Sequence, residues 1–247
     1  MKNRTNAIVA IIAVAGIAAI AQAQAQYTAV NPPPGAELGH AAILGNIYGG
    51  SWSVSGVNVT NGVSSAMRIM DAGAPGGGGI GLPLLDPSIV QDDMWSGGGG
   101  PVTVIAKAKY AGDSHTFGWF DDTQAVPAFA SILSTGVFDV PVTLDLSSDF
   151  RWALNDTTTG RMFTSLPMSN PGIGGRSGET FDQLVSYHIT GPNGLNEIAL
   201  FWEDRIAGEN SDYDYNDAVI TVTAVPAPGT ASLAALGLLA LAGRRRR

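Results

Sequence analysis

Short runs in which apolar and polar residues alternate dominate this chain from Pro101 onward, and they restrict the folds that it can adopt. Between residues 102 and 110 every second residue is apolar or aromatic, while Lys107 and Lys109 fall on the other phase. Successive side chains of a β-strand point to opposite faces of the sheet. The spacing therefore predicts a strand of an antiparallel sheet, with one face on a core and one face in solvent.

Further runs with strand character follow, separated by Gly, Pro, Asn and Asp. They cover residues 115–120, 137–144, 150–154, 161–165, 184–190, 198–202 and 218–225. Pro141 marks 137–144 as an edge strand, because proline cannot donate a hydrogen bond to a neighbouring strand. Only residues 131–135 are expected to form a helical turn. This succession predicts an all-β fold, an antiparallel β-sandwich of jelly-roll type.

The first hundred residues are less regular and rich in glycine. After an extended lead-in over residues 27–39, we expect strands at 42–48, 52–60 and 66–70. The G-x-G-x-x-G match at 76–81 lacks the preceding strand and following helix of a dinucleotide-binding motif, so we interpret it as a flexible surface loop. Residues 27–100 are thus expected to form the N-terminal part of the same sandwich whose core spans 101–224.

Both ends of the chain have the layout of export signals. Lys2 and Arg4 precede an apolar run and small-residue Ala-Gln-Ala sites, which predicts a helical, cleaved signal peptide over residues 1–25. The apolar run at 7–21 has 15 residues. A membrane span needs roughly 20, which favours cleavage over anchoring.

At the other end, residues 225–247 combine a Pro-Ala-Pro segment, an apolar helix-forming run and four terminal arginines. This layout resembles the tripartite PEP-CTERM signal of exported bacterial proteins, although Ala227 stands where that signal usually has Glu. The resemblance implies a hydrophobic transmembrane helix that an exosortase-type sorting protease processes. It also implies a location in the cell envelope, at the cell surface or in an extracellular matrix. Cleavage of the tail and its retention as an anchor both remain open.

The chain without these signals would be strongly acidic. Seven basic and twenty-one acidic residues would remain, a formal charge of −14. Such a surface repels nucleic acid and anionic lipid and favours cation binding or solubility, so we expect no nucleic-acid partner and membrane contact only through the terminal signals. The absence of cysteine excludes disulfides, thiolate metal sites and a cysteine nucleophile.

The densest group of oxygen ligands lies between the last two expected strands. Six carboxylates and two amides fall within fifteen residues: Glu203, Asp204, Glu209, Asn210, Asp212, Asp214, Asn216 and Asp217. The D-x-D-x-N spacing from Asp212 to Asn216 is that with which a calcium-binding loop begins. An EF-hand is excluded, because Asp217 replaces its glycine and no glutamate follows at the twelfth position.

We therefore hypothesise a Ca²⁺ site in a loop between strands. Its expected ligands are Asp204, Asp212, Asp214, Asn216 and Asp217. The alternative is a tight turn in which Asp and Asn side chains accept hydrogen bonds from their own backbone.

Several motifs resemble domain of unknown function 4114, a module of exported bacterial proteins and large adhesins. They are F-W-E-D at 201–204, S-D-Y-D-Y-N-D-A-V at 211–219, D-Q-L-V-S-Y at 182–187 and F-G-W-F at 117–120. The resemblance covers about residues 102–223. It implies a β-sandwich with its acidic motif near the C-terminal end and no established catalysis.

Catalytic patterns are weak in this sequence. The acidic pairs at 92–93, 121–122 and 203–204 could serve a glycosidase only at a suitable separation, which the sequence does not give. His40, His115 and His188 stand singly, and Ser177 lacks the flanking strand and helix of a nucleophile. We therefore expect that the protein is not an enzyme.

The sequence thus predicts a non-catalytic structural or adhesive protein. Its expected partners are the sorting protease and extracellular polysaccharide or other surface proteins. The alternative is a carbohydrate-binding module for that polysaccharide, because flat aromatic rings beside acids can stack on sugars. The candidate rings are Trp52, Trp119, Trp202, Tyr213 and Tyr215, of which Trp202 is expected in the core because it alternates with other apolar residues.

Overall fold

The structure is a computed structural model that describes residues 27–70, 78–81, 90–96, 100–146, 148–171, 182–206 and 211–224. The expected signals at 1–25 and 225–247 lie outside the described residues. Within the described ranges, no helix is both long and apolar enough to cross a membrane.

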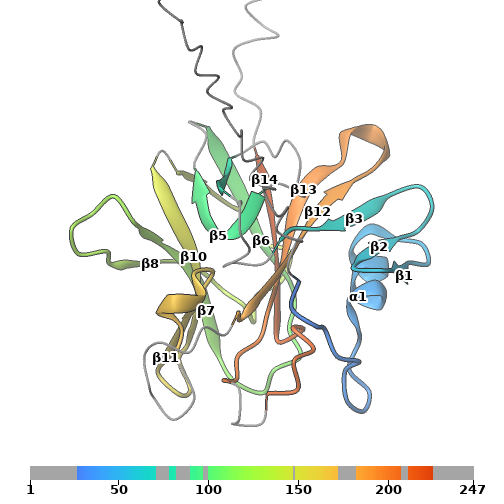
Figure 1. Ribbon diagram of the computed structural model, residues 1–247, viewed down its shortest axis with the longest axis horizontal. Helices are drawn as coiled ribbons and strands as arrows, with labels where there is room; N and C mark the ends of the chain where they lie inside the picture. Colours follow the sequence, from blue (N-terminus) through green and yellow to red (C-terminus); the bar gives the residue numbers. More distant parts are fainter. Residues whose placement is uncertain are drawn as a thin grey trace, which may run out of the picture.

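Two sheets pack face to face, which confirms the predicted all-β sandwich (Figure 1). The larger sheet has the order β1 (Ser53–Ser55), β2 (Asn58–Thr60), β3 (Ser65–Arg68), β12 (Leu184–Thr190), β13 (Asn196–Trp202), β14 (Ala218–Ala224), β6 (Pro101–Ala108) and β9 (Val142–Asp145). The smaller sheet has the order β4 (Gly78–Gly81), β5 (Val90–Ser96), β10 (Asp149–Asp156), β7 (His115–Asp121) and β8 (Phe129–Ser134), with β11 (Arg161–Thr164) also paired to β10. Among the described strand pairs only β4–β5 is parallel.

The main core lies between the two sheets and is rich in aromatic rings. Phe117 and Trp152 of the smaller sheet meet Trp202 of the larger one, with 6.2 Å between the ring centroids of Phe117 and Trp202. These rings are fully buried, as is Phe150 beside them. The alternation in the sequence correctly predicted which residues of β6, β7 and β10 face inward, because burying these rings removes a large apolar area from water.

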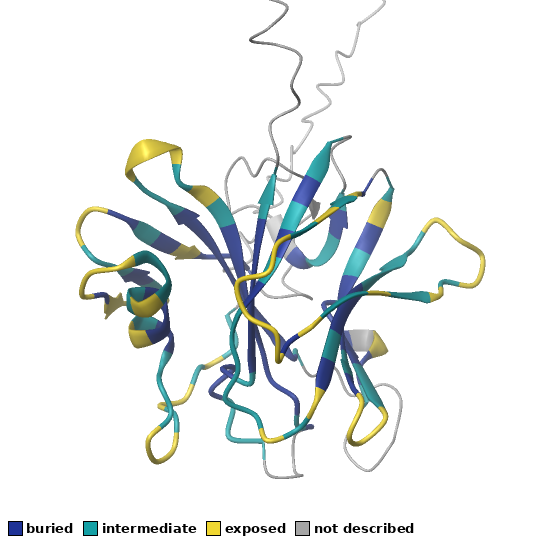
Figure 2. Cartoon of the chain, turned by 180° about the vertical axis from the view of Figure 1, so that it is seen from behind, coloured by how far each residue is buried: buried dark blue, intermediate teal, exposed yellow. Residues whose placement is uncertain are grey.

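A second core covers the opposite face of the larger sheet. There α1 (His40–Tyr48) and the β1–β2 hairpin pack on the side away from β7, β8 and β10 (Figure 1). Ile43 and Leu44 of the helix are buried against Val185 and Phe201. Figure 2 shows buried residues concentrated along the strands and exposed residues at the hairpin tips. Residues 27–60 therefore form a third layer beside β12 and β13.

The expected strand at 42–48 is wrong, because this segment lies in helix α1. Ile43, Leu44 and Ile47 recur at helical spacing and give the helix one apolar face for the second core. The chain leaves the helix at Gly49, which adopts a positive φ of 79°. The expected helical turn at 131–135 is also wrong, because β8 runs through it and pairs with β7.

Two strands were missed in the glycine-rich part. Residues 78–81 and 90–96 show no clear alternation of apolar and polar residues. They form β4 and β5, which pair with each other, and β5 also pairs with β10. The interpretation of 78–81 as a flexible loop is therefore wrong, while residues 76 and 77 lie outside the described residues. The expected strand at 52–60 is divided by a turn at Gly56, and the expected edge strand at 137–144 forms only at β9, after Pro141. Among the described residues, the short helices η1 (Pro167–Ser169) and η3 (Pro192–Gly194) lie in connections between strands.

Candidate functional site

The acidic loop joins β13 to β14, and the pairing of these strands positions its two ends. The last residue pair of the ladder is Trp202 with Ala218, so Glu203 and Asp217 follow directly on either side. The Asp204 backbone N–H donates to Asp217 Oδ2 at 2.8 Å. The sheet therefore holds three carboxylates together at the base of the loop.

We call Glu203, Asp204 and Asp217 the buried triad. One carboxylate oxygen from each lies within 4.8 Å of the other two. Glu203 and Asp204 are each 2% exposed, and Glu203 Oε2 has no hydrogen-bond partner among the described residues. Asp204 is compensated in part, since its Oδ2 lies 2.8 Å from His115 Nε2 and its Oδ1 lies 3.5 Å from Arg205 Nε.

Burial makes ionisation of two members of the triad, Glu203 and Asp217, unfavourable. Burial, reinforced by the neighbouring charge of Asp212, raises the pKa of Glu203 to about 8. Burial followed by the charges of Asp204 and Glu203 also raises the pKa of Asp217 well above its ordinary value. At neutral pH these groups need either bound protons or a cation.

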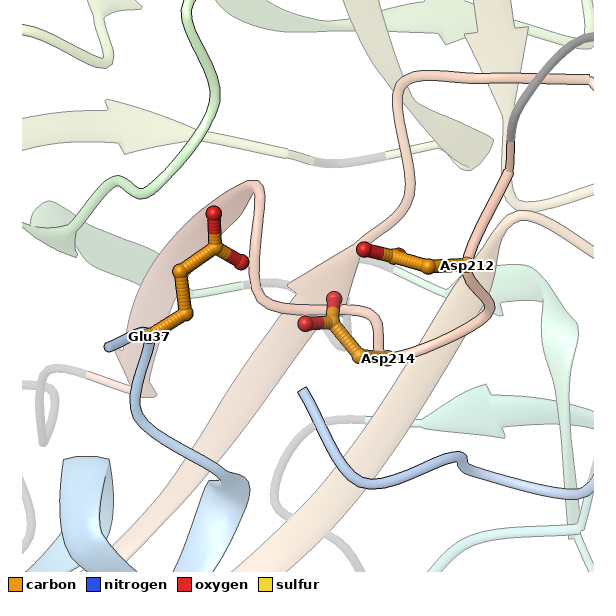
Figure 3. A group of neighbouring side chains, drawn as sticks. All are labelled: Glu37, Asp212 and Asp214. Atoms are coloured by element: carbon orange, nitrogen blue, oxygen red, sulfur yellow. The ribbon is translucent and has the colours of Figure 1, made fainter. Parts of the chain in front are cut away.

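We call Glu37, Asp212 and Asp214 the loop cluster. One oxygen from each lies within 4.8 Å of the others, and Figure 3 shows the three carboxyl groups pointing toward one another. Glu37 comes from the segment before α1, while the two aspartates come from the acidic loop. The cluster thus joins two distant parts of the chain.

Asn216 lies against this cluster. Its Nδ2 donates to Asp214 Oδ2 at 2.7 Å and to Leu38 O at 3.2 Å, and lies 3.5 Å from Glu37 Oε2. The side chain is fully buried, and its Oδ1 has no partner within the described part of the chain. Rotation of this amide would place Oδ1, instead of Nδ2, beside these three oxygens. A cation bound by all of these oxygens would require that orientation.

The loop conformation alternates acids and tyrosines. Tyr213 and Tyr215 adopt left-handed φ values of 59° and 54°, which are unfavourable for residues with a Cβ atom. Asp214 Oδ1 accepts a hydrogen bond from the Asn216 N–H at 3.1 Å. The self-capped turn considered as an alternative to a calcium site is therefore present in part.

Asp214 is 1% exposed. Burial, with the charges of Asp212 and Glu37, raises the pKa of Asp214 to about 7, although the Asn216 N–H opposes this shift. Asp214 of the loop cluster, like Glu203 and Asp217 of the buried triad, is therefore favoured by a bound proton or a nearby cation.

The N-terminal segment is bonded to the acidic loop at several points. Asn31 donates from its backbone N–H to Tyr213 O at 2.9 Å and from its side chain to Asp212 O at 2.7 Å. His40 Nε2 lies 2.9 Å from Asp214 O, and its Nδ1 lies 2.9 Å from the Tyr187 hydroxyl. Burial, assisted by Arg68, lowers the pKa of His40 to about 3, so the neutral ring donates to the carbonyl and accepts from Tyr187.

The same segment forms one wall of a cavity of about 550 Å³. The first residues of α1 and the β1–β2 turn form other walls, and the lining is mainly apolar with His40, Arg68 and Tyr187 among it. The position of residues 27–40 therefore determines both the loop cluster and this cavity.

The structure divides the five predicted calcium ligands between two places. Asp212 and Asp214 belong to the loop cluster with Asn216 beside them, whereas Asp204 and Asp217 belong to the buried triad. Sequence reasoning did not select Glu203, although it adjoins Asp204. It had no signal for Glu37, which reaches the cluster only through the fold. Glu209 and Asn210 lie outside the described residues.

The other candidate groups are used structurally. Asp92 is buried and bonded to Ser186, Asp122 pairs with Arg151, and His188 bonds Asn196. Of the five rings considered for sugar binding, three are buried: Trp52, Trp202 and Tyr215. Trp119 and Tyr213 keep partial exposure.

No protein-family model matches the chain, and no curated protein matches its sequence. The chemistry of the site therefore has to be inferred from its own residues.

Proposed function

We propose that this protein is a non-catalytic, exported β-sandwich protein whose loop cluster binds Ca²⁺. The ion stabilises the module for a structural or adhesive role at the cell surface or in an extracellular matrix. The observation that carries the proposal is the convergence of Glu37 on Asp212 and Asp214, with one oxygen from each within 4.8 Å of the others.

This spacing suits a calcium ion. Ca²⁺ binds six to eight oxygens at about 2.3–2.6 Å, so two ligands on opposite sides of the ion lie roughly 5 Å apart. The carboxylates of Glu37, Asp212 and Asp214 meet that limit, and Leu38 O lies close to them, 3.2 Å from Asn216 Nδ2. Rotation of the Asn216 amide would add its Oδ1. A divalent cation would also offset the repulsion between these three carboxylates, of which Asp214 is buried.

The proposed location rests on the two terminal signals and on the acidic composition. An exosortase-type protease would act on the PEP-CTERM-like tail. The resemblance to domain of unknown function 4114 supports a non-catalytic surface module, with extracellular polysaccharide or other surface proteins as partners.

Thermal unfolding of the full chain with calcium or with a chelator tests the proposal. A site that binds only the folded state stabilises it by about 2.7 kcal/mol when calcium is at a hundredfold excess over Kd. We expect Glu37→Gln to lose a large part of this gain. Asp145→Asn, which changes an exposed acid on β9, should keep it. Equal thermal midpoints of the unchanged protein with calcium and with chelator would contradict the proposal.

A further inference from the structure

We propose that the buried triad, Glu203, Asp204 and Asp217, is a second divalent-cation site, separate from the loop cluster. It takes a hard cation such as Ca²⁺ at the loop end of the β13–β14 hairpin. The inference goes beyond the proposed function, because it adds a site whose three carboxylates are not those of the loop cluster.

The geometry of the triad is set by the sheet. Glu203 and Asp217 adjoin the last pair of the ladder, and Asp204 is fixed by the 2.8 Å hydrogen bond from its N–H to Asp217 Oδ2. One oxygen from each residue lies within 4.8 Å of the others, which one calcium ion can span. Loop residues that adjoin paired strands are held more rigidly than residues in the middle of a loop, so little ordering is needed on binding.

Glu203 supplies an independent indication of a ligand. Its side chain is 2% exposed and its Oε2 has no hydrogen-bond partner among the described residues. A buried carboxylate oxygen without a donor is costly, because water has been removed and nothing replaces it. A cation in contact with that oxygen would remove the deficit.

The neighbouring amide donors do not reach this oxygen, although the Ser211 hydroxyl interacts with the Glu203 carboxyl and opposes the rise of its pKa. The Glu203 N–H donates to Gln183 O at 3.0 Å. In the amide orientation that satisfies its surroundings, Gln183 donates to the main-chain carbonyls of Glu203 and Arg205 at 3.1 and 3.0 Å. The amide donors of Glu203 and Gln183 are thus directed at backbone oxygens.

The basic side chains near the triad form ion pairs with one of its three carboxylates. His115 and Arg205 both face Asp204, and Arg205 also pairs with Asp113 at 2.5 Å. Glu203 and Asp217 have no ion pair with a basic residue within the described ranges. A divalent cation therefore complements these two carboxylates best, with Asp204 as the third ligand.

The ligand set selects the class of ion. It consists of carboxylate oxygens, and the chain has no cysteine. Such ligands favour Ca²⁺ or Mg²⁺ over softer metals. Mg²⁺ retains several waters, which a site with two carboxylates at 2% exposure does not easily accommodate, so Ca²⁺ fits better.

Calcium stoichiometry of the full chain at neutral pH, measured by isothermal titration calorimetry, tests the inference. We expect two ions per chain in the unchanged protein, one in Glu203→Gln and one in Glu37→Gln. Asp145→Asn should retain both. Asp217→Asn provides a second test of the triad, because its amide oxygen can still accept the Asp204 N–H. Circular dichroism of each variant checks that it is folded.

The outcomes separate the two sites. A single ion that Glu37→Gln removes and Glu203→Gln retains would overturn the second site and leave the proposed function intact. A single ion that survives Glu37→Gln would support the triad and contradict the loop cluster. No bound calcium would overturn both, and a proton shared within the triad would then account for its burial. If both triad variants fail to fold, one ion per unchanged chain that Glu37→Gln abolishes still overturns the inference.

Discussion

The surroundings of individual carboxylates in the acidic loop favour their neutralisation by a proton or a cation. Glu203 and Asp214 are buried among other acids, and their pKa values are raised to about 8 and about 7. A proton and a cation compete for such groups. The protein without calcium should therefore respond to pH differently from the protein with calcium.

We predict that the chelated protein loses stability as pH rises from about 5 to about 8. Below the ordinary glutamate pKa of 4.5, Glu203 is protonated in both the folded and unfolded states. Between that value and about 8, only the folded state keeps the proton, so each rise in pH favours unfolding. Denaturant unfolding across this range with a chelator measures the effect.

Calcium should reverse this trend, since the ion has fewer protons to displace at higher pH. The stability gained from calcium should grow between pH 5 and 8. A gain that is independent of pH would mean that calcium binds away from these raised-pKa groups.

Part of the site could be predicted from residue types alone. The D-x-D-x-N spacing identified Asp212, Asp214 and Asn216, because alternate acidic and amide side chains of one loop are visible in the sequence. Glu37 could not be identified in this way, since its approach depends on packing α1 and its leading segment on the larger sheet. The division of the acidic residues into two clusters could not be predicted from the sequence either, because it depends on where strands β13 and β14 end.

At the scale of elements, period-2 patterns identified strands with one buried face, such as β6, β7 and β10. They failed for glycine-rich β4 and for β5, because these sequences do not alternate and the segments are strands only through pairing with their neighbours. They also failed at α1, where a short apolar run fits both a strand and a helix. The second core decides that case, because a helix can present Ile43, Leu44 and Ile47 together.

The close approach of β7 and β8 gives a test of this packing. A Cβ atom at Gly118 would overlap Ala130 O and contact the Phe129 ring at 2.6 Å. We predict that Gly118→Ala destabilises the protein by about 1–3 kcal/mol, because the backbone of β8 must move. Gly136→Ala is the matched control, since its Cβ would come no closer than 3.8 Å to Ser134 Oγ. Equal unfolding midpoints for the two variants would refute this description of the β7–β8 pair.

At the scale of the whole molecule, the loop cluster ties the N-terminal layer to the sandwich. Asn31, Glu37 and His40 all contact the acidic loop. Calcium should therefore protect the lead-in as well as the loop. The cavity beside His40 should become more accessible when the ion is removed.

We predict that chelation speeds amide hydrogen exchange in residues 31–40 and 211–217, with little change in β10. The inter-sheet core that surrounds β10 does not depend on the loop cluster. Exchange measured by mass spectrometry should show the same increase in Glu37→Gln even with calcium. A uniform increase across the chain would instead indicate global destabilisation.

The most direct test of calcium binding by the loop cluster is a crystal structure determined with Ca²⁺ and anomalous scattering data. We predict an anomalous peak about 2.3–2.6 Å from oxygens of Glu37, Asp212 and Asp214. Well-ordered carboxylates with no peak between them, in crystals grown at millimolar calcium, would contradict the account.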